Sequence, residues 1–155
     1  MRAVSNAGPI IHLSWVGRLD LLGELFEEVL VPPAVRDEVL PAGSDLLGMP
    51  AIRAAFATEQ LILHAISDRG AVAALEEHLH RGEAEAIVLT QEVRADLLLV
   101  DDKEARLHAQ NRGLVISGTI GILRMTRERG LIQHVIPVLG ELQLPGHMEL
   151  HCAGR

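Results

Sequence analysis

Four carboxylates stand at the two ends of one largely apolar segment, GEAEAIVLTQEVRADLLLVDD, at residues 82–102. Glu83 and Glu85 open the segment, and Asp101 and Asp102 close it. Carboxylates that meet in space repel one another unless a cation lies between them. Oxygen ligands without His or Cys among them favour Mg²⁺ or Mn²⁺ over zinc. A cation held in this way can clamp phosphate oxygens and activate water, so the pattern indicates hydrolysis of a phosphodiester if the chain brings these groups together.

Glu38 is a further carboxylate whose surroundings call for an explanation. It shares a helix face with Val35 and Val39, because residues three and four apart are neighbours on a helix. An acidic group pinned to an apolar stripe is costly to bury unless a cation or another partner compensates it. That partner is either a metal ion or an arginine, and the candidate arginines are Arg36 and Arg124.

Each of these polar residues also has a simpler structural explanation. Glu83 stands at a helix start, where the backbone N–H groups favour a negative side chain. One of Asp101 and Asp102 can cap the next helix while the other is solvated, although one cap does not need two aspartates. Thr119 can cap the helix that follows it or bind phosphate at its N-terminus. The sequence leaves these alternatives open.

The elements that must position these residues alternate along the chain. Short apolar runs bounded by Gly, Pro, Asn or Asp predict five buried strands, at residues 2–5, 28–32, 61–66, 96–101 and 114–117. Helical patterns lie at 9–25 (two short helices divided near Gly17, the second capped by Asp20), 33–40, 68–80 (capped by Asp68), 83–93, 103–112 and 119–129. Residues 41–50 read as a loop or a linker to a minor helix.

Strands that alternate with helices predict a three-layer α/β/α sandwich with a central, mainly parallel sheet of four to five strands. In such sheets, ligands bind beyond the carboxyl ends of the strands. Asp101 and Asp102 follow the apolar run Leu97–Val100, and Asn6 follows the first strand. We therefore expect all three side chains at the same edge of the sheet.

The whole-chain numbers bound the function. A chain of 155 residues with 48% apolar residues predicts one globular domain, 1–155, and its net charge is 14 − 21 = −7. An acidic protein needs a local basic patch or a metal to bind a polyanion, and RMTRERG, with Arg124 and Arg127, is the best such patch. A single cysteine, no secretory segment and no run near about 18 apolar residues predict a cytoplasmic protein that does not cross a membrane.

Other chemistries are poorly supported. His78 and His80 are two residues apart and diverge on a helix, while His147, His151 and Cys152 lie in a tail without a second ligand pair, so zinc is disfavoured. Neither a Gly-rich dinucleotide turn nor a Walker-type Gly-Lys loop is present. Phosphoryl transfer through an acceptor aspartate at the end of the first strand is disfavoured, because that position holds asparagine.

Four ordered blocks resemble the PIN-domain family, in particular a VapC-like branch of small prokaryotic proteins mostly known as predicted nucleic-acid-binding proteins. The blocks are VSNAGPIIHLSWVGRLDLL, VLVPPAVRDEVL, GEAEAIVLTQEVRADLLLVDDKEAR and GLVISGTIGILRM. They span residues 3 to about 132, which leaves 133–155 as a C-terminal extension. The resemblance implies an Mg²⁺- or Mn²⁺-dependent ribonuclease, often the toxin of a toxin-antitoxin pair. It also implies a homodimer, for which the Leu-rich residues 13–22 are a candidate interface.

The resemblance also assigns roles to single residues. It implies that Glu38, Glu83 and Asp101 are the catalytic metal-binding acids, that Asp102 is a fourth, and that Glu85 is an accessory residue of this branch. One departure is Asn6, which stands where the family has an aspartate. Asparagine keeps a carbonyl oxygen for a metal or its water, but it lacks the charge and cannot act as a base. A second function therefore stays open, namely a module that binds nucleic acid or protein without catalysis.

Overall fold

The computed structural model describes residues 1–132, in which five strands form one sheet in the order β3-β2-β1-β4-β5. The strands are β1 (Arg2–Ser5), β2 (Glu28–Val31), β3 (Ile62–Leu63), β4 (Leu97–Leu99) and β5 (Ile116–Ser117). All four pairings are parallel, and Val4 of β1 lies in register with Leu30 on one side and Leu98 on the other. Each of the five predicted strands is present. The strands β3, β4 and β5 are shorter than predicted.

Eight helices of the described residues connect and cover the strands. They are α1 (Ala7–Trp15), α2 (Asp20–Leu25), α3 (Pro33–Val39), α4 (Met49–Ala57), α5 (Arg69–Leu75), α6 (Arg81–Val93), α7 (Lys103–Asn111) and α8 (Thr119–Glu128). Asp68 caps α5 as predicted, by accepting from the Ala71 N–H. Several bounds differ: α5 ends at Leu75, before the turn into α6, α6 begins at Arg81 rather than at residue 83, and Asp20 is the first residue of α2 rather than its cap. No helix in this part of the chain is long and apolar enough to span a bilayer.

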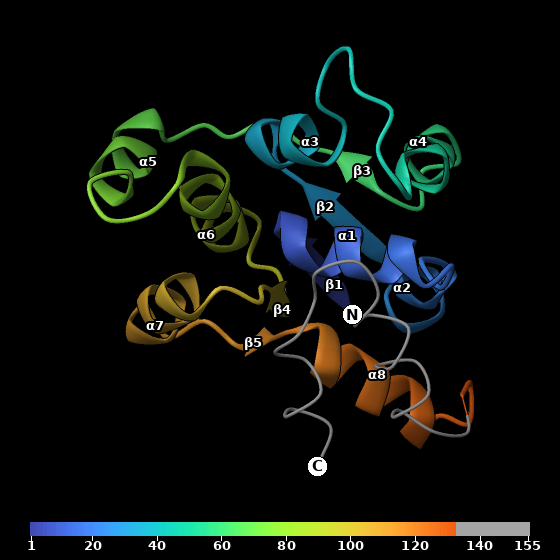
Figure 1. Ribbon diagram of the computed structural model, residues 1–155. Helices are drawn as coiled ribbons and strands as arrows, with labels where there is room; N and C mark the ends of the chain where they lie inside the picture. The colour runs from blue at the N-terminus through green and yellow to red at the C-terminus, as the bar shows by residue number, and fades with distance from the viewer. Residues whose placement is uncertain (133–155) are drawn as a thin grey trace.

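Alternate residues of the central strands enter two separate cores, because side chains of a strand point to opposite faces in turn. Leu97 and Leu99 of β4 pack in one core, and Leu98 between them packs in the other. Figure 1 shows α5, α6 and α7 on one side of the sheet and α1, α2, α4 and α8 on the other. The architecture is the predicted α/β/α sandwich, with a wholly parallel sheet.

The leucines of residues 13–22 are used inside this fold. Leu13, Leu21 and Leu22 are fully buried, and Leu19 is 5% exposed. Their apolar surface stabilises the core beneath α1 and α2. These leucines therefore have no surface left for a partner, and a homodimer interface formed by the other side chains of residues 13–22 stays a prediction.

The order of the strands creates a crevice between β1 and β4. From β1 the chain passes to β2 on one side, and it later returns to place β4 on the other side. In parallel sheets, ligands bind where the strand order reverses in this way. Asn6 directly follows β1, and its backbone N–H donates to the Leu99 carbonyl oxygen at the end of β4, at 2.9 Å. The fold therefore brings residues 6 and 101 to the same place.

Candidate active site

A cavity of about 390 Å³ opens at this edge of the sheet. We call it the acidic cavity, and its walls are formed by Asn6, Ala7, Gly8, Glu38, His80, Glu83, Asp101 and Asp102. Four carboxylates and one side-chain amide thus meet there, from the end of β1, from α3, from the start of α6 and from the end of β4. The structure brings together the five residues that the sequence singles out as metal ligands; that role itself stays a prediction.

Glu38 reaches the cavity from α3, whose first turn begins with Pro33. Its carboxylate lies against Gly82 of α6, where an added Cβ would collide with the Glu38 Oε1 atom. The surrounding protein desolvates this carboxylate and raises its pKa, an effect that the nearby His80 partly opposes. A glycine at this position therefore allows Glu38 to approach α6.

No arginine compensates Glu38 in residues 1–132. Arg36 instead pairs with its neighbour Asp37, with Nε at 2.9 Å from Oδ1. Arg124 lines a different cavity. The structural alternative to a metal ion at Glu38, an arginine partner, is thus not seen in the described part of the chain.

Glu83 combines a structural contact with a place in the cavity wall. It occupies the third position of α6, and its Oε1 accepts from the His80 backbone N–H at 3.0 Å. Burial raises the pKa of Glu83, and the neighbouring Asp102 raises it further, while the hydrogen bond from His80 lowers it. The helix-start explanation of Glu83 is correct, yet it leaves a desolvated carboxylate facing the acidic cavity.

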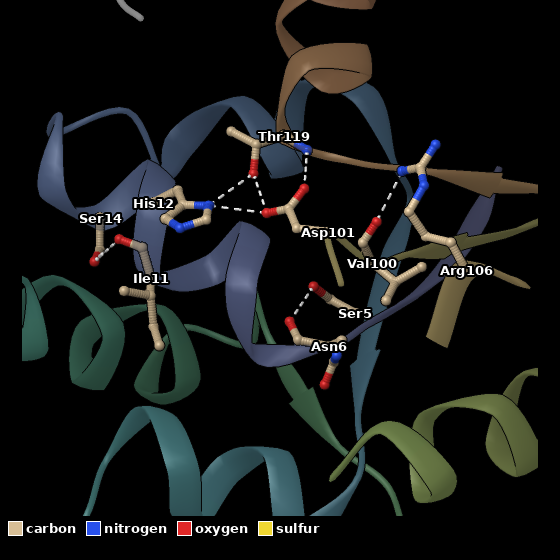
Figure 2. A network of polar contacts seen from close by, with 9 residues as sticks. All are labelled: Ser5, Asn6, Ile11, His12, Ser14, Val100, Asp101, Arg106 and Thr119. Carbon is tan, nitrogen blue, oxygen red and sulfur yellow. Dashed lines mark hydrogen bonds and ion pairs between the residues drawn. The ribbon is translucent and has the colours of Figure 1, made fainter. Parts of the chain in front are cut away.

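Asp101 is held by three donors, as Figure 2 shows. Oδ1 accepts from the Thr119 backbone N–H at 2.7 Å, while Oδ2 accepts from the Thr119 hydroxyl at 2.6 Å and lies 2.8 Å from Nδ1 of His12. Burial by itself would raise the pKa of Asp101, but the contacts with His12 and Thr119 outweigh it and lower the pKa. The side chain is therefore an ionised and firmly oriented carboxylate.

Thr119 does not cap α8, which is one of the two roles considered for it. It is the first residue of α8, Gly118 takes the cap position, and the Thr119 hydroxyl is turned toward Asp101 instead. The hydroxyl donates to the Asp101 carboxylate, and the negative charge of this acceptor strengthens the hydrogen bond. Thr119 thus orients the Asp101 carboxylate, although it does not itself line the acidic cavity.

Asn6 is buried, with 6% of its surface exposed. Its side-chain oxygen Oδ1 has no hydrogen-bond partner among the described residues. Leaving a buried carbonyl unpaired costs about 1–3 kcal/mol. Asn6 lines the acidic cavity, so a hard cation or its water held there is a candidate partner for this buried oxygen.

The remaining predicted residues divide between the site and the scaffold. Asp102 lines the cavity and also caps α7, since its Oδ2 accepts from the Ala105 N–H at 3.0 Å. Glu85 is 2% exposed and is not part of the cavity wall. Its Oε1 accepts from the Ala34 N–H at the start of α3 at 2.9 Å, and its Oε2 pairs with Arg69 at 2.7 Å. Glu85 therefore ties α3 and α5 to α6, and its expected accessory role at the site stays a prediction.

The donor set fits a hard divalent cation in chemistry, although the side chains are not gathered around one point. No group of three His, Cys, Asp or Glu side chains within residues 1–132 is arranged to hold a metal ion. Asp101, Asp102 and Glu83 each turn toward a protein N–H, and Glu83 and Asp102 still lie close enough for Asp102 to raise the pKa of Glu83. Apart from His80, the polar side chains of the lining offer oxygen atoms, and no Lys or Arg of residues 1–132 pairs with Glu38, Glu83 or Asp101.

Sequence reasoning missed two residues of this region. His12 contacts Asp101 although 89 positions separate them in the chain, and no local pattern marks it. His80 lines the cavity, whereas His78 stacks on His108 with ring centroids 5.7 Å apart, so the two histidines diverge, although they lie between α5 and α6 and not on the helix that was predicted. The tail residues His147, His151 and Cys152, with the whole extension 133–155, lie outside the described residues.

Comparisons with known proteins agree with this architecture. A solved PilT N-terminus domain protein from the hyperthermophilic archaeon Sulfolobus solfataricus P2 is similar in fold, with a TM-score of 0.58 and 20% identity over 83% of this chain and 95% of that chain. No curated protein sequence matches the chain significantly. The family model described as DUF3368: PIN domain matches residues 2–148. Since that match spans nearly the whole sequence, the chain belongs to the PIN-domain family.

Proposed function

We propose that this protein is a metal-dependent ribonuclease that hydrolyses RNA phosphodiester bonds, with Mg²⁺ or Mn²⁺ as its cofactor. PIN domains are generally nucleases, they typically use divalent metal ions, and they commonly bind nucleic acids. The observation that carries the proposal is the convergence of Glu38, Glu83 and Asp101 on one cavity. No Lys or Arg of the described residues pairs with any of the three.

The residues divide the work in this proposal. Glu38, Glu83 and Asp101 would hold the cation, with Asn6 and Asp102 assisting, and a bound cation supplies charge neutralisation at the phosphate and a more acidic water. Asp101 is fixed in direction by Thr119 and His12. In the metal-free protein, burial raises the pKa values of Glu38 and Glu83, so a bound cation would compensate two desolvated carboxylates. Asn6 can offer only its oxygen.

The direct test is cleavage of a mixed-sequence single-stranded RNA in the presence of Mn²⁺ or Mg²⁺. We expect cleavage that is lost with EDTA, with Asp101→Asn and with Glu83→Gln. Glu77→Gln is the matched control, because Glu77 is exposed and lies outside the cavity. Folded wild-type protein that cleaves with neither metal would contradict the proposal, as would cleavage that survives EDTA.

The second candidate function is a PIN-like module that binds nucleic acid or protein without cleaving. Asn6 is the observation that favours it, because this position provides no negative charge. The lack of a preformed group of three ligands in residues 1–132 points the same way. Metal-independent binding of RNA by a protein that shows no cleavage with Mn²⁺ would favour this module over the nuclease.

We also propose that the nuclease acts as a VapC-like toxin whose cognate antitoxin covers the site. An apolar cavity of about 320 Å³ adjoins the acidic cavity and shares Glu38 with it. Its rim carries Leu46 and Leu47, which are 57% and 65% exposed, beside Trp15. An antitoxin that places an apolar side chain in the apolar cavity and a basic side chain against Glu38 would block both the apolar and the acidic cavity. Growth arrest on expression of the wild type, but not of Asp101→Asn, would support this role, whereas equal growth of both would oppose it.

A further inference from the structure

A third cavity, of about 480 Å³, lies on the other side of Asp101. We call it the basic cavity, and its walls include His12, Asp101, Arg106, Ser117, Gly118 and Arg124. Asp101 lines both cavities, so the two adjoin along one side chain. In Figure 2, Asp101 stands between His12 and Thr119 on one side and the Arg106 side chain on the other.

The charges of the basic cavity are unbalanced in favour of cations. Its carboxylate, Asp101, already accepts from Thr119 and contacts His12. Arg106 and Arg124 form no ion pair with any carboxylate in residues 1–132. Elsewhere in that part of the chain, ion pairs with carboxylates are formed by Arg2, Arg18, Arg36, Arg69 and Arg81.

The two arginines differ in how firmly they are held. Arg106 is half-buried, and its Nη1 donates to the Val100 carbonyl oxygen at 3.0 Å, which leaves its other N–H groups to the cavity. A Cβ at Gly118 would lie 2.9 Å from that Nη1 and 2.6 Å from Oδ1 of Asp101, so the glycine allows both to approach. Arg124 is exposed on α8 and can move to meet a ligand. Guanidinium groups match phosphate oxygens in geometry and charge.

We propose that the basic cavity binds a backbone phosphate of single-stranded RNA next to the phosphate at the acidic cavity, through Arg106 and Arg124. The inference rests on the proposed function for the identity of the substrate. It explains how a chain with a net charge of −7 binds a polyanion at an acidic site, because the neighbouring phosphate meets two unpaired cations. It also separates Arg124 from Arg127, which was expected to act with it but does not line either cavity.

The test measures binding of a labelled single-stranded RNA by fluorescence anisotropy in EDTA, over a range of salt concentrations. Each lost phosphate contact lowers the slope of log K against log salt by about 0.7 for single strands. We expect Arg124→Gln to weaken binding and lower the slope by about 0.7, and Arg106→Gln/Arg124→Gln to lower it by about 1.4. If the double variant fails to fold, Arg124→Gln decides alone, because its side chain is exposed.

Arg127→Gln is the matched control, since it removes the same charge from an exposed position on the same helix. An unchanged slope in Arg124→Gln, an equal change in Arg127→Gln, or no binding by the wild type at low salt would overturn the inference. A DNA strand of the same sequence should give equal slope changes, and a change confined to RNA would contradict recognition through phosphate. If cleavage fails while the slope changes, only the proposed function falls; if cleavage occurs while the slope is unchanged, only this inference falls.

Discussion

Asp101 and Glu38 face the same cavity, yet their surroundings act on their charges in opposite directions. Asp101 receives hydrogen bonds from Thr119 and contacts His12, which lower its pKa despite its burial. Glu38 is desolvated without a comparable donor, and its pKa is raised. Ionised Asp101 therefore stabilises the metal-free fold, whereas ionised Glu38 destabilises it.

Neutral substitutions of these two residues should move stability in opposite directions. In EDTA near pH 7.5, Asp101→Asn should lower the free energy of unfolding by about 2 kcal/mol through lost charged hydrogen bonds, and the Tm by about 4–8 °C. Glu38→Gln should raise the Tm. The stabilisation by Asp101 is complete above its ordinary pKa of 3.8 and is lost as pH falls through the lower folded value. The penalty from Glu38 grows as pH rises past 4.5 toward its raised folded value.

Thermal unfolding followed by circular dichroism measures both shifts. Glu77→Gln, an exposed change of the same kind as Glu38→Gln, should leave the Tm unchanged. A lower Tm for Glu38→Gln would contradict the view that its charge is uncompensated.

Asn6→Asp should trade stability for metal affinity. The new carboxylate would join Glu38, Glu83, Asp101 and Asp102 in one cavity, so like-charge repulsion should lower the Tm in EDTA. With Mn²⁺ the added charge should tighten binding, and the Tm should rise more in the variant than in the wild type. A higher Tm for Asn6→Asp in EDTA, or a smaller Mn²⁺ response, would contradict this role for position 6.

At the scale of elements, the contact between α3 and α6 sets the position of Glu38. Gly82 lies where any side chain would displace the Glu38 carboxylate, while Glu85, one turn further along α6, accepts from the Ala34 N–H and secures the start of α3. The segment GEAEA therefore has two structural roles. Gly82 and Glu83 shape the acidic cavity, and Glu85 holds the two helices together.

Gly82→Ala should reduce RNA cleavage without lowering the stability of the fold. Alanine in a helix is more stable than glycine by about 0.5–1 kcal/mol, and the atom it meets is the far end of a flexible side chain, so the fold should remain intact. Glu38 would be pushed aside, so RNA cleavage with Mn²⁺ should fall by about tenfold or more, as for a ligand moved out of place. Unchanged cleavage by a folded Gly82→Ala protein would show that Glu38 does not need this approach.

The sequence predicted the strands and most helices because their patterns are local. Strands of near-continuous apolar residues and caps such as Asp68 carry their own signals. His12 carries none, since its contact with Asp101 depends on how α1 packs beside the end of β4. Glu85 carries no such signal either. It stands two residues after Glu83 in the same GEAEA segment, but its hydrogen-bond partner, the Ala34 N–H, lies on α3. Local pattern finds the elements, whereas contacts between distant elements decide which acid faces the cavity.

For the whole molecule, the strand order explains why one cavity collects residues from four parts of the chain. The crevice between β1 and β4 joins Asn6 and Asp101, and α3 and α6 add Glu38 and Glu83. The parallel direction of the strands was predictable from alternating strands and helices. The basic cavity on the far side of Asp101 was not, because Arg106 and Arg124 lie on different helices and their lack of carboxylate partners is visible only in three dimensions.

The central claim is that the acidic cavity binds a divalent cation, and titration of Mn²⁺ into the metal-free protein by calorimetry, with the Tm measured alongside, tests it most directly. At about 100 times Kd, a bound ion stabilises the fold by about 2.7 kcal/mol, which corresponds to a rise in Tm of about 5–10 °C. We predict binding and this rise for the wild type and for Glu77→Gln, and the loss of both in Glu83→Gln and Asp101→Asn. No binding by the folded wild type, or equal binding by all four proteins, would contradict the account.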